Sequence, residues 1–537
     1  MNDATTNGEM TEKASSESRE SDRRAEYVTD VNYVRAFEGD LSPARLRLVA
    51  ALNGFVPPAA DAFDYCELGS ASGDTIATLA GAYPRSRFVG VDVNPDHIAA
   101  ADALADAGKL ENVRFLERDF AALSTVDLPA LDYVSAHGVL SWVGPDKRKA
   151  VIDIASRKLK QGGLLYVSYN ALPGWAQLEP LRQLIVSRGE MVGGSSLDRA
   201  RAGLDLAKLM KECGAEYFQS NPAAAAMLKT IDRLGLPYVV HEYLHAHWTP
   251  MYFAQVAAEM AASDLYFVGP LPLYLNYRDL AIPEPLQPLF RGIDDRVTFE
   301  SLKDFALNEF FRRDVYVKGR MPRSEDATRA YLEDAVFGYV PTAVPSEGAR
   351  ELRLPHRTLR FMGALFDTLL PALDDGAATV ASLAARPELA PFGSRRIGDA
   401  LLRLSLGEHI APMRQPTFAL RTPIEGLLAL PLAYNRAVVH DALARGASVA
   451  LASTVLGNGV EISVVEAVAI VLLTEVAPRD RTAWLADLAA NASWRLKVRD
   501  EVVSGAPDRA RVLEEEIRQF QSARLPRMLD LGILTRG

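Results

Sequence analysis

Short apolar stretches and helical patterns alternate along residues 61–170, and this alternation limits the possible folds more than any other feature. Stretches rich in β-branched and aromatic residues are expected strands at 64–68, 87–92, 112–119, 131–137 and 163–169. Helical patterns lie between them, as at 74–83, 95–109 and 147–163. Such alternation is typical of a parallel sheet covered by helices on both faces. The sequence therefore predicts an α/β, doubly wound fold, whose ligands bind at the carboxyl ends of the strands.

The first strand is followed by a glycine-containing turn, ELGSASGD, from Glu67 to Asp74. Gly69 and Gly73 flank this turn, and glycine allows backbone to pass close to a ligand because it has no Cβ. Asp92 closes the second expected strand, where a carboxylate can accept hydrogen bonds from ribose hydroxyls. This arrangement suits either a nicotinamide cofactor or S-adenosylmethionine. The dehydrogenase pattern G-x-G-x-x-G is absent, and Glu67 precedes the first glycine by two residues, which favours S-adenosylmethionine.

The expected cofactor contacts follow from these strand ends. Glu67 is expected to face the methionine part, Asp92 the ribose, and Asp119 the adenine amino group. His137 ends the fourth expected strand, at the same edge of the sheet. The alternatives are plain turn glycines, a solvated Asp119, and a His137 that caps neighbouring backbone. The predicted cofactor-binding residues are Glu67, Gly69, Ser70, Ala71, Gly73, Asp92, Val93, Asn94, Asp119, Phe120 and His137.

The stretch HEYLH, residues 241–245, matches the H-E-x-x-H signature of zinc hydrolases. That chemistry needs a helix, which brings positions i and i+4 to one face. Residues 236–248, LPYVVHEYLHAHW, are rich in β-branched and aromatic residues and predict a strand. On a strand His241 and His245 would be roughly 13 Å apart, too far to share one ion. No metal site is therefore predicted.

Several further segments carry a resemblance to a known family. AHGVLSWV (136–143), SYNALPGW (168–175) and the stretch from HEYLHAHWTPMYF to FFRRDVYVKG occur in order behind ELGSASG. Together they resemble class I S-adenosylmethionine-dependent methyltransferases with a methyltransferase regulatory domain, a group that includes bacterial protein lysine methyltransferases. The likeness covers most of residues 27–320. The sequence departs from the family at Ala71, where the family usually has glycine, and this methyl group is expected to narrow the turn.

The resemblance places the methyl acceptor near strands four and five. His137, Tyr169 and Tyr243 are predicted to orient the attacking amine, which must arrive neutral in an apolar channel. The predicted substrate-binding residues are Tyr33, Trp142, Asn170 and Trp175. The alternative for these aromatic residues is an ordinary core position. Tyr33 and Phe37 either cover the cofactor or pack against the sheet.

The expected architecture is a Rossmann-like, seven-stranded methyltransferase core with a helical insertion at 176–236. Residues 239–244 are expected as the sixth strand, 250–264 as a helix and 265–275 as the seventh strand. The predicted parts are a disordered tail at 1–26, an N-terminal helical cap at 27–60, the cofactor-binding core at 61–205, a regulatory and insertion region completing the sheet at 206–330, and a mainly helical, winged-helix-like region at 331–537. Removing that last region is expected to preserve cofactor binding and abolish protein methylation.

Composition restricts the partners and the compartment. The net charge is -10 and the pI about 5.5, which does not suit a protein that binds nucleic acid by charge. The chain has only two cysteines, Cys66 and Cys213, no signal-peptide pattern and no apolar run of about 20 residues. We therefore expect a cytoplasmic protein without a membrane span. The oligomeric state stays open.

These observations predict an enzyme that transfers a methyl group by in-line displacement, most readily to protein lysine. Two alternatives remain at this point. One is O- or N-methylation of a small molecule, and the other is a cofactor-sensing binding protein with little catalysis.

Overall fold

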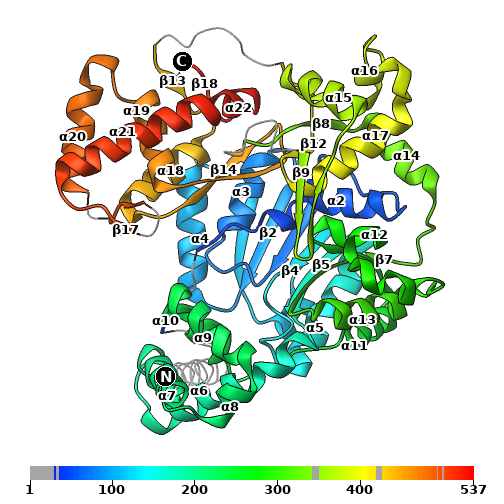
Figure 1. Cartoon of the computed structure of the whole chain (residues 1–537), viewed down its shortest axis with the longest axis vertical. Helices are drawn as coiled ribbons and strands as arrows, with labels where there is room; N and C mark the ends of the chain where they lie inside the picture. Colours follow the sequence, from blue (N-terminus) through cyan, green and yellow to red (C-terminus); the bar gives the residue numbers. More distant parts are fainter. Residues whose placement is uncertain (1–29, 32–34, 342–349, 419–425, 493, 499–500) are drawn as a thin grey trace, which may run out of the picture.

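The computed structural model describes residues 30–31, 35–341, 350–418, 426–492, 494–498 and 501–537. A seven-stranded sheet lies at its centre, in the order β3-β2-β1-β4-β5-β7-β6 (Figure 1). All strands are parallel except β7, which runs antiparallel to both of its neighbours. The strands are β1 (Asp64–Leu68), β2 (Arg87–Asp92), β3 (Val113–Glu117), β4 (Leu131–Ala136), β5 (Leu159–Asn170), β6 (Leu265–Leu271) and β7 (Phe311–Lys318). The prediction of a Rossmann-like, seven-stranded core is confirmed.

Helices cover the sheet where the sequence predicts them, with one shifted boundary. Helix α3 (Asp74–Ala82) follows β1, α4 (Pro95–Gly108) follows β2, and α5 (Pro145–Lys158) follows β4. Asn94 begins α4 by accepting a hydrogen bond from the amide of Asp96. The expectation that α5 continues to the glycines at 162–163 is wrong, because β5 already begins at Leu159 and pairs with β4 there. Strand pairing thus overrides the helical pattern of residues 159–161.

A helical insertion follows β5, as predicted. It consists of α6 (Glu179–Val192), α7 (Ser196–Glu212), α8 (Glu216–Ser220), α9 (Pro222–Leu234) and α10 (Leu236–Tyr243), at one end of the molecule in Figure 1. The prediction that residues 239–244 form the sixth strand is wrong, because residues 239–243 belong to α10 and Leu244 is its C-cap. Gly235, at φ 86°, separates α9 from α10, and Val239 and Val240 bury their side chains in the core of the insertion. Tertiary packing has overridden β propensity here.

The strands that complete the sheet come later in the chain than expected. Helix α11 (Phe253–Ala262) and strand β6 agree with the predicted helix and the first part of the strand expected at 265–275. The remaining strand is β7, which the sequence reading missed. It follows α13 (Arg296–Leu307) and inserts between β5 and β6. Its charged residues Arg312 and Asp314 are buried, which hid the usual apolar signature of a central strand.

The part of the chain after residue 320 contains short strands as well as helices. Strands β8 (Val336–Tyr339), β11 (Ala378–Thr379) and β12 (Ile410–Met413) form a three-stranded sheet beside α15 (Ala364–Asp374), α16 (Val380–Ala384) and α17 (Gly393–Leu404). This arrangement is compatible with a winged helix, which remains a prediction. The remaining elements include α14 (Glu325–Asp334), α18 (Ala433–Arg445), the hairpin of β14 (Val449–Ser453) and β15 (Asn458–Ile462), α19 (Val464–Thr474), α20 (Arg481–Asn491), α21 (Ala506–Ala523) and α22 (Leu525–Asp530).

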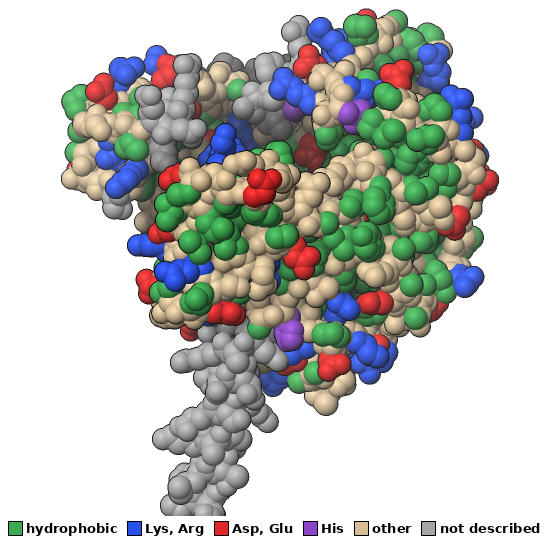
Figure 2. All heavy atoms as spheres, turned by 60° about the horizontal axis from the view of Figure 1, so that its bottom comes forward, with side chains coloured by type: hydrophobic (Ala, Val, Ile, Leu, Met, Phe, Trp, Pro, Cys, Tyr) green, Lys and Arg blue, Asp and Glu red, His purple; other side chains and the backbone are tan. Residues whose placement is uncertain are grey.

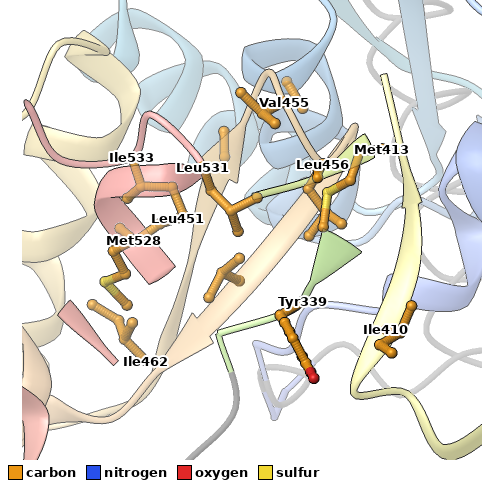
Figure 3. Packing of buried hydrophobic residues seen from close by; sticks show 14 of the residues in the cluster. Tyr339, Ile410, Met413, Leu451, Val455, Leu456, Ile462, Met528, Leu531 and Ile533 are labelled. Carbon is orange, nitrogen blue, oxygen red and sulfur yellow. The ribbon is translucent and has the colours of Figure 1, made fainter. Parts of the chain in front are cut away.

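One hydrophobic core joins this C-terminal part to the sheet. The β14–β15 hairpin packs on α3, and α18 packs on α4. Tyr434 of α18 shares a hydrogen bond of 2.7 Å with the Thr78 hydroxyl of α3. Figure 3 shows the C-terminal side of this core, where side chains from β12, β14, β15 and α22 meet. The helix that follows the glycine turn is therefore packed between the sheet and the C-terminal part.

No helix within the described ranges is long and apolar enough to cross a membrane. On the face drawn in Figure 2, basic and acidic side chains of the described residues are interspersed with hydrophobic groups.

Candidate functional site

A cavity of ≈680 Å³ opens at the carboxyl ends of β1, β2 and β4. Its wall includes every predicted cofactor-binding residue except Gly73, and it also includes Trp142 from the predicted acceptor set. The other side of the wall comes from α10 and the residues just after it. These residues are Pro237, Tyr238, His241, Glu242 and His245. The position agrees with the rule that doubly wound sheets bind ligands at their strand ends.

The glycine turn is shaped to bring backbone close to the cavity. Gly69 adopts φ 81°, and a Cβ there would lie 2.7 Å from Val139 Cγ2, so only glycine fits. Gly73 adopts φ 76° and begins α3 behind the wall. Ala71 has φ 44°, in the left-handed region that side chains rarely adopt. Asp92 Oδ2 accepts a hydrogen bond of 2.9 Å from the amide of Ala71 and so holds the unusual residue in place.

Carboxylates concentrate at the end of the cavity next to the turn. Glu67, Asp92, Glu38 and Asp74 all line it, and Arg35 pairs with Asp74 at 2.7 Å. Burial, followed by the nearby charges of Glu38 and Asp92, raises the pKa of Glu67 to about 8. Glu67 Oε2 is buried and has no hydrogen-bond partner among the described residues. An unpartnered carboxyl oxygen in this setting suits a cationic ligand group.

Asp119 and Phe120 lie at the third strand end, as predicted. Asp119 Oδ1 accepts a hydrogen bond of 2.9 Å from the amide of Ala121, and Oδ2 lies 3.0 Å from Lys147 Nζ. The Asp119 carboxylate is therefore positioned by two neighbours at the cavity wall and is not simply a solvated strand end.

His137 lies at the end of β4, with its ring in the cavity wall. Its Nδ1 is 3.0 Å from the Tyr166 hydroxyl and 3.3 Å from Ser168 Oγ. Burial, assisted by the positive charge of Arg313, lowers the pKa of His137 to about 4. The ring is therefore neutral at physiological pH. Its Nε2 lies 3.9 Å from Glu38 Oε1.

Several residues predicted to handle the acceptor do not line the cavity. Tyr169 is buried, and its hydroxyl donates a hydrogen bond of 2.7 Å to Asp314 Oδ2, inside an ion cluster with Arg312. Trp175 and Tyr243 are buried in the core of the helical insertion. These three positions match the core alternative. Asn170 stands directly behind the wall, where its side-chain amide donates 2.9 Å to Glu242 Oε1.

Two N-terminal residues, Tyr33 and Phe37, were expected either to cover the cofactor or to pack against the sheet. Tyr33 lies outside the described residues. Phe37 is described, and its ring contacts the position of Gly459 in β15, next to a second hollow, of ≈580 Å³. Glu38 lines both hollows.

Sequence reasoning missed several cavity residues, some of them next to the predicted strand ends and others from distant segments. Arg35, Asp74, Thr75, His97 and the α10 residues all contribute to the wall. The spacing of Pro237 and His241 is helical, and this periodicity was the available signal, although His245 lies beyond the end of α10. Although α10 is a helix, the described residues contain no group of three or more His, Cys, Asp or Glu side chains suited to a metal.

Comparisons with known proteins agree with this geometry. A family model described as a methyltransferase domain matches residues 66–165, and one described as a predicted methyltransferase regulatory domain matches residues 236–318. The chain is 28% identical over 518 residues to protein sll1526 of Synechocystis sp., which covers 94% of this chain and 99% of that protein. Protein RP789 of Rickettsia prowazekii is 25% identical over 326 residues, or 59% of this chain and 57% of that one.

Among solved structures, PKMT2 from Rickettsia typhi in complex with AdoHcy has a TM-score of 0.67 with this chain. The two are 19% identical, and the match covers 94% of this chain and 100% of that one, so the likeness shows a shared fold.

Most of the cavity residues lie within the two ranges that the family models match. The first spans β1 to β5 and includes the glycine turn, whereas the second begins with α10 and ends with β7. The cavity also fits S-adenosylmethionine, because backbone comes close to it at Gly69 and because the buried Glu67 Oε2, which has no partner among the described residues, suits a cationic group. The chain therefore carries a methyltransferase domain and a methyltransferase regulatory domain, and it is an S-adenosylmethionine-dependent methyltransferase.

Proposed function

We propose that this enzyme methylates the side-chain amine of lysine in a protein substrate. Three observations support the proposal: the ordered resemblance of segments 136–143, 168–175 and 241–319 to protein lysine methyltransferases, the full-length likeness to PKMT2, and the cavity itself. The observation that carries most weight is that the cavity continues from the donor-binding strand ends to a polar wall on α10. The methyl donor and a narrow acceptor group can therefore lie in the same cavity.

The donor end is assigned from the residues that line the strand ends. Asp92 would hold the ribose, Asp119 and Phe120 the adenine, and Glu67 with the Gly69 turn the methionine part. When bound, S-adenosylmethionine supplies an electrophilic methyl group on a positively charged sulfur. The Asp92 carboxylate complements the positive charge of the donor, and binding of that charge would favour ionisation of the buried Glu67, whose pKa is about 8.

The chain contributes to transfer mainly by positioning. A methyl acceptor must reach the methyl carbon along the line opposite the sulfur, and a cavity that fixes both reactants makes this encounter effectively intramolecular. Trp142, Val143, Leu234 and Pro237 supply apolar surface to the wall. Removing water around an amine favours its neutral, nucleophilic form.

The proposal is tested with the full-length protein and methyl-labelled S-adenosylmethionine in a cell lysate. We expect label in the protein fraction and methyl-lysine after acid hydrolysis. Label confined to small molecules would show that the acceptor class is wrong. Donor binding without turnover in any fraction would support a binding role and contradict the proposal.

A further inference from the structure

The HEYLH stretch, which forms no metal site, instead forms part of the cavity wall. Pro237, Tyr238, His241 and Glu242 of α10 line the cavity at spacings of three to four residues, together with Leu234 at the end of α9 and His245 just after α10. On a helix this spacing places side chains on one face. The glutamate of the motif therefore points to the compartment of the methyl donor.

The position of Glu242 is fixed by the end of β5. Asn170, the last residue of β5, donates a hydrogen bond of 2.9 Å from its side chain to Glu242 Oε1. The backbone amide of Asn170 in turn donates 2.9 Å to Ser141 Oγ, in the loop after β4. The anchor of Glu242 is thus tied to two neighbouring strand ends and not to α10 alone.

The sheet order separates Glu242 from the donor contacts. Strands β1 and β4 lie between β2, which carries Asp92, and β5, which carries Asn170. At about 4.8 Å per strand, the ends of β2 and β5 are roughly 14 Å apart. Glu242 therefore belongs to the side of the cavity beyond His137, where an acceptor has room to enter.

The surroundings of Glu242 favour a proton acceptor near neutral pH. Burial raises its pKa to about 7, against the lowering effects of the Asn170 hydrogen bond and the Arg182 charge. Arg182 of α6 is otherwise engaged, since it donates 2.9 Å to the His245 carbonyl and lies 4.6 Å from the centre of the Trp248 ring.

Two titratable neighbours of Glu242, His245 and Tyr243, are uncharged near neutral pH. Burial, with the nearby His241 and Arg182, lowers the pKa of His245 to about 4, so its ring is neutral. Burial raises the pKa of Tyr243 far above neutral, so its hydroxyl keeps its proton. Trp142 Nε1 and His245 Nδ1 are buried without a hydrogen-bond partner among the described residues, and both side chains line the cavity. These atoms point to a polar ligand at this end.

We infer that Glu242 binds the ammonium group of the methyl acceptor and takes its proton before transfer. The inference rests on the proposed function in that the acceptor is an amine. The carboxylate forms an O–H bond with one proton of R-NH₃⁺ and leaves R-NH₂. The nitrogen lone pair then bonds to the methyl carbon as the S–CH₃ electron pair moves to sulfur, which gives R-NH₂CH₃⁺ and neutral AdoHcy. Glu242 finally releases its proton to water.

This assignment gives the regulatory domain a catalytic residue. That domain begins at residue 236, the first residue of α10, and so contains Glu242. The core holds the methyl donor, and the regulatory domain supplies the group that prepares the acceptor.

The test compares Glu242→Gln, Glu242→Asp and the control Glu179→Gln. Glu179 is exposed on α6 and also acts on Arg182 through its charge, but it does not line the cavity. The first readout is binding of n-butylammonium to the enzyme saturated with AdoHcy, measured by calorimetry, with n-butanol as the uncharged probe. We expect Glu242→Gln to weaken n-butylammonium binding about tenfold or more, with no effect on n-butanol.

The second readout is the pH profile of kcat/KM for the labelled protein fraction. In the wild type the rate rises with pH through the Glu242 pKa of about 7, because the base acts unprotonated. We expect Glu242→Gln to lose this rise and about 100-fold in kcat/KM, whereas Glu242→Asp keeps the pH-dependent rise at a reduced rate. Glu179→Gln should match the wild type in both readouts.

The outcomes separate the two proposals. Equal n-butylammonium binding by wild type and Glu242→Gln, or an unchanged pH profile, would overturn the role of Glu242. A second outcome is that the wild type labels no protein but binds n-butylammonium, and that only Glu242→Gln weakens this binding. In that case the amine site stands and protein lysine is the wrong acceptor. Unchanged AdoHcy affinity in all variants would show that they remain folded.

Discussion

At the scale of single residues, Asp92 has two roles in the cavity. Its Oδ2 holds the amide of Ala71, at 2.9 Å, and its Oδ1 holds the amide of Asn94, also at 2.9 Å. The same carboxylate lines the proposed ribose position. Removing it would both loosen the left-handed Ala71 and delete the ribose acceptor.

We therefore expect Asp92→Ala to weaken AdoHcy binding about 100-fold or more, since two charge-assisted hydrogen bonds contribute a few kcal/mol. Calorimetric titration with AdoHcy measures the effect. Asp153, which lies on α5 and does not line the cavity, provides the control Asp153→Ala, for which we expect wild-type affinity. Equal binding by wild type and Asp92→Ala would remove Asp92 from the donor site.

Glu67 gives a pH dependence of stability whose sign is fixed by its raised pKa. The folded protein keeps the Glu67 proton up to a pKa of about 8, whereas the unfolded chain releases it near 4.5. The free energy of unfolding contributed by this group is therefore fully present below 4.5 and is lost as pH rises to 8. Urea unfolding of the free protein at several pH values should show a smaller loss in Glu67→Gln than in wild type. Identical slopes would mean that Glu67 ionises freely in the folded state.

The donor side of the site could be predicted because its residues are local to strand ends. Once β1, β2 and β4 are placed, the topology alone brings Glu67, Asp92 and His137 to one edge. Glu242 and Arg35 come from segments far from these strands in the sequence. No local pattern in those segments shows that they come back to the cavity. The acceptor predictions at Tyr169 and Trp175 depended on aromatic residue type, which does not distinguish a cavity wall from a core.

At the scale of elements, the least expected feature is the charged middle of the sheet. Arg312 of β7 forms buried ion pairs with Glu300 and Asp304 of α13 and with Asp314. Lys303 of α13 pairs with Glu300 in the same cluster. Buried charges in a central strand obscure the apolar pattern from which strands are predicted, so β7 escaped detection while β1 and β2 were placed to the residue.

Tyr169 joins this cluster to β5, and its contribution should be structural. We expect Tyr169→Phe to lower the free energy of unfolding by about 1–2 kcal/mol, because one hydrogen bond to a buried carboxylate is lost while Arg312 still pairs with Asp314. Denaturant unfolding measures this loss. The kcat/KM for methyl transfer should be unchanged at a temperature where both proteins are folded, and a large drop in kcat with unchanged stability would restore Tyr169 to the catalytic group.

At the scale of the whole molecule, the C-terminal part is continuous with the core of the donor site. Gly81 of α3 faces Ala452 of β14, and Gly108 of α4 faces Tyr434 of α18, each too close for a larger residue. Arg414 donates to the carbonyl of Ala82 and pairs with Asp61. The sequence predicted a separate region here because nothing in its local pattern indicates which distant helix it contacts.

This packing changes the expected result of truncation. Removing residues 331–537 would expose apolar surface on α3 and α4, so we expect the remaining protein to lose AdoHcy binding together with its cooperative unfolding transition. Calorimetric melting and AdoHcy titration of the truncated protein measure both. A truncated protein that binds AdoHcy with wild-type affinity would show that the core is independent, as the sequence alone suggested.

The packing of α3 also affects which side of the cavity opens more easily. Its residues Thr75–Ala82 are all buried, whereas α10 belongs to the core of the insertion, which is a cluster separate from those on either side of the sheet. The amides of α3 should therefore exchange with solvent only when the whole molecule opens. We therefore expect amides in α10 to exchange faster than those in α3, and the product to leave on the side of the insertion and not past the glycine turn.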